Sequence, residues 1–179
     1  EQFLIAMPGM QDPHFARTVS LICQHDAQGA MGLVLNQDSE FNLGELFDQL
    51  DLECRNQDLR ALPVLSGGPV QSERGFILHQ DGRSWDSSMH LANGLTVTTS
   101  RDILQALAAG DGPGRFQVLL GYSGWTAGQL EQEIADNSWL NAPVDAEIIF
   151  SRPVEQRWQA SAKSLGIDLS LISGQAGHA

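Results

Sequence analysis

The stretch "TVSLICQHDAQGAMGLVLN" at residues 18–36 decides the expected fold, because it contains two short apolar segments separated by the turn sequence "DAQG". Two short apolar segments joined by a few turn residues are typical of a β-hairpin. The strand around Cys23 is therefore expected to pair antiparallel with the strand from Met31 to Asn36. Since side chains alternate along a strand, Val19, Leu21, Cys23 and His25 are expected to share one face.

Further strands and helices are predicted on both sides of this hairpin. Apolar segments bounded by Gly, Pro or polar residues predict strands, at residues 3–8, 63–66, 75–79, 95–100, 115–122 and 146–150. Apolar residues at helical spacing behind capping residues predict helices, after Asn42 in a capping box with Glu45, from Ser100 to a closing Gly110, over residues 126–137 and after Pro153. Hairpins mixed with crossovers predict an α+β fold, with a mixed, largely antiparallel sheet and helices packed against it.

The totals favour one folded domain over residues 3–172, with a mobile C-terminal tail at 173–179. The chain has 179 residues, of which 42% are apolar and 18% charged, which lies in the globular range. No run approaches the roughly 20 apolar residues of a membrane helix, so a soluble protein without membrane association is expected. The start "EQFLIAMP" has no basic residue before its apolar run and no initiator Met, so a trimmed chain without a secretory signal is expected.

The two cysteines favour a cytoplasmic protein. Cys23 and Cys54 lie far apart in a domain that is large enough to fold without a disulfide. Cys23 is also a candidate redox residue, because a Cys23–His25 dyad would lower the pKa of the thiol. The preferred alternative is a small core residue, since side chains two apart on a strand stand nearly 7 Å from one another.

The charge of the chain argues against direct binding of nucleic acid. The formal net charge is −12, and Lys163 is the one lysine among ten basic residues. Proteins that bind DNA by themselves neutralise several phosphates with clustered Lys and Arg. Direct binding of nucleic acid by this chain is therefore not expected.

The stretch "LGYSGWTAGQLEQEIADNSW" at residues 120–139 places Ser123 in a predicted turn between a strand and a helix. A nucleophile elbow needs Gly two residues after the serine, where this chain has Trp125, and the one later histidine is His178. No catalytic residue is assigned. Instead, Thr126 is expected to cap the helix, with Gln129 reaching back in a capping box. Trp125 is expected to be buried and Gln129 to be exposed or to face a ligand.

Three polar side chains outside that stretch leave alternatives open. His25 and His79 each end an apolar strand and could meet to bind a metal or an anion, but structural histidines bonded to backbone are preferred. Arg74 could hold a carboxylate or phosphate, although pairing with an internal acid is preferred. The chain has no HxH, HExxH or CxxC spacing, so no metal and no cofactor is expected.

Four stretches together resemble the AlgH/YqgE family of bacterial proteins: "FLIAMPGMQDPHFARTV", "CQHDAQGAMGLVLN", "SGGPVQSERGFILH" and "LGYSGWTAGQLEQEIADNSWL". The resemblance implies one compact α/β domain, a role in transcriptional regulation, and no settled catalytic residue. Motif positions carried over without assigned roles are His25, Gly29, Gly32, Asn36, Gly67, Gly68, Pro69, Arg74, Gly75, His79, Gly121, Tyr122, Trp125, Gln129, Glu131 and Trp139.

The expected function is that of a regulatory protein which acts through a protein partner rather than by binding DNA. The alternative is an enzyme or ligand sensor with a small-molecule pocket near His25, His79 and Tyr122. Because the motif residues come from different elements, most of them are expected to converge on one surface region. The candidate pocket comprises His25, Asn36, Arg74, His79, Tyr122, Trp125 and Gln129.

Overall fold

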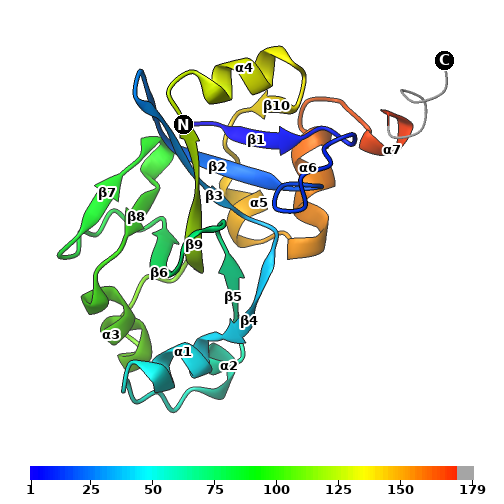
Figure 1. Cartoon of the computed structure of the whole chain (residues 1–179). Helices are drawn as coiled ribbons and strands as arrows, with labels where there is room; N and C mark the ends of the chain where they lie inside the picture. The colour runs from blue at the N-terminus through cyan, green and yellow to red at the C-terminus, as the bar shows by residue number, and fades with distance from the viewer. Residues whose placement is uncertain (173–179) are drawn as a thin grey trace.

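A single curled sheet organises the computed structural model, which describes residues 1–172 (Figure 1). Its main strand order is β10-β1-β2-β3-β9-β6-β8-β7, with β5 joining β9 and β4 joining β5. β5 runs parallel to β9 and the other pairs are antiparallel, which confirms the mixed, largely antiparallel sheet. The strands are β1 (Phe3–Ala6), β2 (Val19–Asp26), β3 (Gly29–Val34), β4 (Asp38–Asn42), β5 (Pro63–Ser66), β6 (Val70–His79), β7 (Ser88–His90), β8 (Thr96–Thr98), β9 (Phe116–Thr126) and β10 (Trp139–Ala142).

The helices cover different parts of this sheet, as Figure 1 shows. α1 and α3 bury Phe47 and Leu107 against Ile77 of the sheet. α5 and α6 pack Ile149 and Trp158 into the largest core cluster, while α4 covers Trp125 and Trp139. The helices are α1 (Leu43–Gln49), α2 (Gln57–Arg60), α3 (Arg101–Ala109), α4 (Gln129–Ala135), α5 (Ala146–Phe150), α6 (Arg157–Lys163) and α7 (Leu169–Ile172), with 3-10 turns at Ala92–Gly94 and Val154–Gln156.

The hairpin and two helix ends were predicted correctly from local sequence signals. β2 pairs antiparallel with β3, as predicted. Asn42 accepts a hydrogen bond from the Glu45 amide and Glu45 returns one to the Asn42 amide, which is the complete capping box. Gly110 ends α3 in the left-handed conformation that glycine adopts without steric cost.

The predicted shared face of β2 is wrong at His25. The pairing with β3 shifts by one residue between Ile22 and Gln24, so Cys23 forms a bulge. Cys23 packs in the same core cluster as Leu21, whereas His25 turns toward α4 and bonds Glu131 there. An extra residue in one strand reverses the alternation beyond it.

The predicted turn at residues 121–125 is wrong, because β9 continues through it to Thr126. Gly121 has φ +77°, and a Cβ there would lie 2.5 Å from the carbonyl oxygen of Gly68. Glycine at 121 therefore lets β9 bend and pass close to the segment between β5 and β6. Thr126 ends the strand and does not cap the helix, since Gly128 precedes the first residue of α4.

Other elements also differ from the expectation. Residues 146–150 form helix α5 rather than a strand, because the Asp145 carboxylate accepts a hydrogen bond from the Glu147 amide and starts a helical turn. β4, β10 and α2 are short elements that the sequence pattern did not predict. No helix within residues 1–172 is long and apolar enough to cross a membrane. The predicted mobile tail at 173–179 lies outside the described residues.

Candidate functional site

A cleft with a volume of about 580 Å³ lies between two arms of the sheet. One arm is the tip of the β2–β3 hairpin and the other is β7 with β8, while β6 and β9 supply the residues between them. Its lining comprises Gln24, Asp26, Gln28, Gly29, Ala30, Met31, Arg74, Phe76, Ser87, Ser88, Met89, Val97, Thr99, Tyr122, Gly124 and Trp125.

Aromatic side chains from two neighbouring strands give the cleft an apolar wall. Tyr122 on β9 lies edge-on to Phe76 on β6, with ring centroids 5.8 Å apart and an interplanar angle of 67°. Ser123, the next residue, is fully buried, and its hydroxyl donates to the Gly67 carbonyl at 3.3 Å. The strand alternation thus presents Tyr122 to the cleft and withholds the Ser123 hydroxyl from it.

Arg74 contributes a cation to the same wall. Its guanidinium lies 5.2 Å from the Phe76 ring centroid, and Nη1 donates to Gln71 Oε1 at 3.5 Å. Within residues 1–172, no carboxylate oxygen lies within 4.0 Å of this guanidinium. The preferred interpretation from the sequence, pairing with an internal acid, is therefore wrong for the described residues. The guanidinium keeps most of its donors for an external acceptor.

Trp125 borders the cleft, but its side chain lies on the α4 face of β9, the same face as the Ser123 side chain. Its side chain is buried, as predicted, and Nε1 donates to Glu133 Oε1 at 3.2 Å. Gln129 is exposed, as predicted, but it does not line the cleft. Its Oε1 accepts from the Thr126 amide at 2.9 Å and its Nε2 donates to Glu133 Oε2. Of the two hydrogen bonds of the predicted capping box, the one from the Thr126 amide to the Gln129 side chain is therefore present.

His25 and Asn36 do not converge on the cleft, contrary to the expectation. His25 Nε2 bonds Glu131 Oε1 at 2.6 Å on the opposite face of the hairpin, because the bulge has turned it there. The bond from His25 lowers the pKa of the Glu131 carboxyl below its ordinary value. Asn36 accepts from the Val19 amide and donates to the Arg17 carbonyl, so it fixes the other end of the hairpin.

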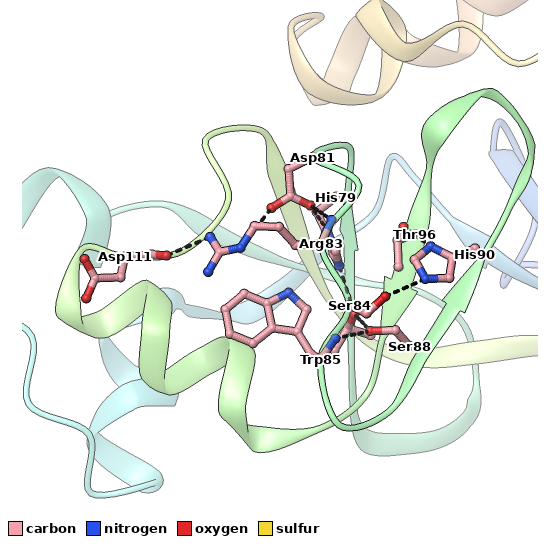
Figure 2. A network of polar contacts seen from close by, with 10 residues as sticks. His79, Asp81, Arg83, Ser84, Trp85, Ser88, His90, Thr96 and Asp111 are labelled. Atoms are coloured by element: carbon pink, nitrogen blue, oxygen red, sulfur yellow. Dashed lines mark hydrogen bonds and ion pairs between the residues drawn. The ribbon is translucent and has the colours of Figure 1, made fainter.

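His79 lies outside the cleft as well, in the network of polar contacts drawn in Figure 2. Its side chain is fully buried, with Nδ1 at 2.7 Å from Asp81 Oδ1 and Nε2 at 2.8 Å from Thr98 Oγ1. The sequence suggested bonds to backbone, whereas both ring nitrogens contact side chains. His25 and His79 belong to separate networks, so the predicted meeting of the two is wrong.

Cys23 shows the properties of a core residue. Its side chain is buried beside Leu21 and Leu33, and both Cys23 and Cys54 are free. Burial raises the pKa of the Cys23 thiol to about 12, with a smaller contribution from Glu1. The thiolate that redox chemistry needs is therefore scarce at neutral pH.

Sequence reasoning missed the hydroxyl side chains of the second arm. The Ser87 and Thr99 hydroxyl oxygens lie 3.0 Å apart beside the cleft, whereas the Ser88 hydroxyl contacts Thr98 on the opposite face of β7 and β8. Residues 80–94 show neither strand alternation nor helical spacing, so the sequence pattern did not single out the serines of this segment. The run of threonines in "LTVTTS" beside an apolar strand was the available hint.

Comparisons with known proteins agree with the geometry of the fold. A family model described as AlgH-like matches residues 3–170. A UPF0301 protein of Thioalkalivibrio sulfidiphilus is 56% identical over 180 residues, which cover 99% of this chain and 95% of that protein. The solution structure of AlgH from Pseudomonas aeruginosa has 49% identity and a TM-score of 0.81, over 99% of this chain and 94% of that one.

A more distant relative shares the same fold. The crystal structure of a Corynebacterium diphtheriae protein is 23% identical, with a TM-score of 0.76 over 96% of this chain and 90% of that one. The family match spans nearly the whole chain, and the relatives are covered over most of their own length. The chain described here belongs to the AlgH-like family.

Proposed function

We propose that this protein is a regulatory binding protein whose cleft takes a small anionic molecule with an apolar or aromatic part. The observation that carries the proposal is Arg74, a cation on the cleft wall without a carboxylate partner among residues 1–172. Arginine pairs with carboxylates and phosphates through two parallel hydrogen bonds, which gives both affinity and orientation.

The rest of the lining suits such a ligand. Ligand sites commonly measure about 300 to 1,000 Å³ and combine apolar walls with a few placed polar groups. The volume of about 580 Å³ falls in this range. Phe76 and Tyr122 would contact the apolar part of the ligand while Arg74 holds the anion.

Regulation is proposed to pass through a protein partner. A net charge of −12 repels phosphate backbones, and this favours an indirect effect on transcription over direct DNA binding. The partner would respond to occupancy of the cleft. A cytoplasmic location is part of the proposal, and the two free cysteines support it because they suit a reducing compartment.

The test is purification of the protein from native extract, followed by mass spectrometry of the small molecules and proteins that accompany it. An anionic compound is expected with the parent and is expected to be depleted in Arg74→Gln. Arg55→Gln is the matched control, because Arg55 is exposed, pairs with Glu53 and lies outside this cleft. Equal amounts of every small molecule in the parent and Arg74→Gln would contradict the proposal.

A further inference from the structure

β7 is the last strand at one end of the sheet, so within the described residues no strand pairs with its outer side (Figure 1). The hydrogen bonds to β8 show which backbone groups point to that side. The Thr99 amide donates to the Ser87 carbonyl at 2.9 Å, and the Leu91 amide donates to the Leu95 carbonyl at 2.7 Å. Bonded and non-bonded pairs alternate along an antiparallel ladder. The odd-numbered residues of β7 therefore bond to β8, and the even-numbered ones direct their backbone groups to the open side.

The even-numbered residues of β7 are Ser88 and His90. Their amide and carbonyl groups have no hydrogen-bond partner among residues 1–172. The next even-numbered amide along the chain, that of Ala92, donates to the Glu1 carboxylate at 3.1 Å. Glu1 thus satisfies one outward amide, while those of Ser88 and His90 stay open. A row of unpaired backbone donors and acceptors is a template for a further strand.

The open side of β7 borders the cleft. Ser88 belongs to the cleft lining although its hydroxyl contacts Thr98 on the opposite face, so it borders the cleft with its main chain. Met89 lines the cleft beside its strand partner Val97, and its surface is 36% exposed. Side chains alternate along a strand, so every second side chain of a chain paired with this edge would lie over Met89.

The charges near this edge favour a basic segment. Asp26 lines the cleft at the hairpin tip, and Asp86 lies two residues before β7. Neither carboxylate has a basic nitrogen within 4.0 Å in the part of the chain that the structure describes. The net charge of −12 adds a long-range attraction for cations. Arg74 stands on β6, two strands away from the open side, where the proposed small anion binds.

We propose that the open edge of β7 docks an extended segment of a partner protein as an added strand of the sheet. The backbone of this segment pairs with the amide and carbonyl groups of Ser88 and His90. Its apolar side chains lie over Met89 and alternate with Lys or Arg side chains, which the surrounding carboxylates attract. That the segment belongs to the regulatory partner rests on the proposed function, whereas the open edge does not.

The first test selects peptides from a random octapeptide phage library on the immobilised protein. Enriched sequences are expected to alternate apolar residues with Lys or Arg, and one of them is synthesised and its affinity measured by calorimetry. Methylation of its backbone nitrogens then separates strand pairing from side-chain contacts. Every second amide of an added strand faces β7. Methylation of alternate amides in one register should therefore weaken binding at least about 10-fold, and methylation in the other register much less.

Two variants of His90 are a matched pair, with the melting temperature measured for each. His90→Pro removes the outward amide and keeps the hydrogen bonds between β7 and β8, because that amide takes no part in them. It should weaken peptide binding about 10-fold. His90→Ala loses the same contacts with Ser84 and Thr96 but keeps the amide, so it should bind within about 3-fold of the parent.

Hydrogen exchange on the parent protein reads the same edge without any substitution. The amides of Ser88 and His90 should exchange at least about 10-fold more slowly when the peptide is bound, because the added strand gives them acceptors. The amide of Met89 already bonds to β8 and should change less. Unchanged exchange at Ser88 and His90 with bound peptide would overturn the proposal.

Three further results would overturn it: a library that yields no sequence or acidic sequences, equal effects of the two methylation registers, or a folded His90→Pro that binds like the parent. A dimer in sedimentation that is lost in His90→Pro would also overturn it, because a second copy would then cover the edge. Peptide docking without an anionic compound in native extract would remove the proposed ligand and keep the edge. A compound that depends on Arg74, without peptide docking, would do the reverse.

Discussion

The β2–β3 hairpin and the end of β9 have one covered face and one open face, and the two differ in how their polar groups are satisfied. On the covered face, α4 packs over Trp125 and Trp139, and the Glu133 carboxylate accepts from both indoles. On the open face, Arg74 and the Tyr122 ring border the cleft. The polar groups of the covered face bond within the protein, so substitutions there should lower the stability of the fold. The polar groups of the open face border the cleft, so substitutions there should weaken ligand binding.

Loss of the central indole should be the most damaging single change on the covered face. Trp125 packs in a buried cluster with Ile22 and Leu130 and stacks near Phe15, with centroids 5.9 Å apart. Trp125→Ala is expected to lower the free energy of unfolding by about 3 to 5 kcal/mol, because it leaves a cavity. Denaturant unfolding measures the free energy of unfolding of both proteins. A loss below about 1 kcal/mol would mean that the Trp125 side chain is not tightly packed on the covered face.

The carboxylate between the indoles should rank second. Glu133→Ala leaves the Nε1 groups of Trp125 and Trp139 without their acceptor, at 3.2 and 3.0 Å in the parent. A buried donor left unpaired costs about 1 to 3 kcal/mol. Glu133→Gln keeps an acceptor oxygen and should cost less in the same denaturant titration. Equal losses in the two variants would show that the hydrogen bonds contribute little.

Removal of the capping side chain at the start of α4 should have a smaller effect. Gln129→Ala removes the acceptor of the Thr126 amide and the donor to Glu133. Loss of such a cap typically costs about 1 kcal/mol. Thermal melting should fall by a few degrees, as is typical of that energy in a domain of this size. Unfolding of the whole domain would contradict an exposed capping role.

Acid should weaken the contact between the hairpin tip and α4. The hydrogen bond from His25 lowers the pKa of the Glu131 carboxyl below its ordinary 4.5. A lowered folded-state pKa means that this stabilisation is present above the ordinary pKa and is lost as the pH falls through the lowered value. Glu131→Gln should remove that part of the pH dependence when unfolding is followed from pH 7 to pH 3. An unchanged pH profile would show that the bond is absent in solution.

The smallest effect on stability is expected on the open face. Arg74→Gln removes no carboxylate contact within the described residues, so the free energy of unfolding should stay within about 0.5 kcal/mol of the parent. Denaturant unfolding beside Arg55→Gln checks this. A large loss of stability in Arg74→Gln but not in Arg55→Gln would show that the open face also stabilises the fold.

Features that depend on a few adjacent residues were predicted from the sequence. Features that depend on pairing between strands far apart in the chain were missed. The capping box at Asn42 and the left-handed Gly110 follow from a few adjacent residues, and both were predicted. Ser88 meets Thr98 because β7 pairs with β8, and Thr98 lies beside His79 because β8 also pairs with β6. Neither pairing leaves a trace in the spacing of these residues along the chain.

The candidate site was predicted in part for the same reason. Arg74, Tyr122 and Trp125 do line one cleft, whereas His25, Asn36, His79 and Gln129 do not. The face of His25 was predicted wrongly because a bulge has no signature in a strand pattern. Asn36 lies at the predicted end of the hairpin, but that end is away from the cleft. Both errors concern three-dimensional placement, and the residue types themselves were sensible choices.

The bulge at Cys23 lets β2 carry one residue more than the facing part of β3. Ile22 pairs with Gly32 and Gln24 pairs with Met31, so Cys23 has no partner of its own in β3. Deleting Cys23 would therefore leave a regular ladder in which Gln24 and Asp26 still line the cleft and His25 still faces α4. Among related proteins, a gap of one residue at this position would thus leave the ligand chemistry of the hairpin tip unchanged.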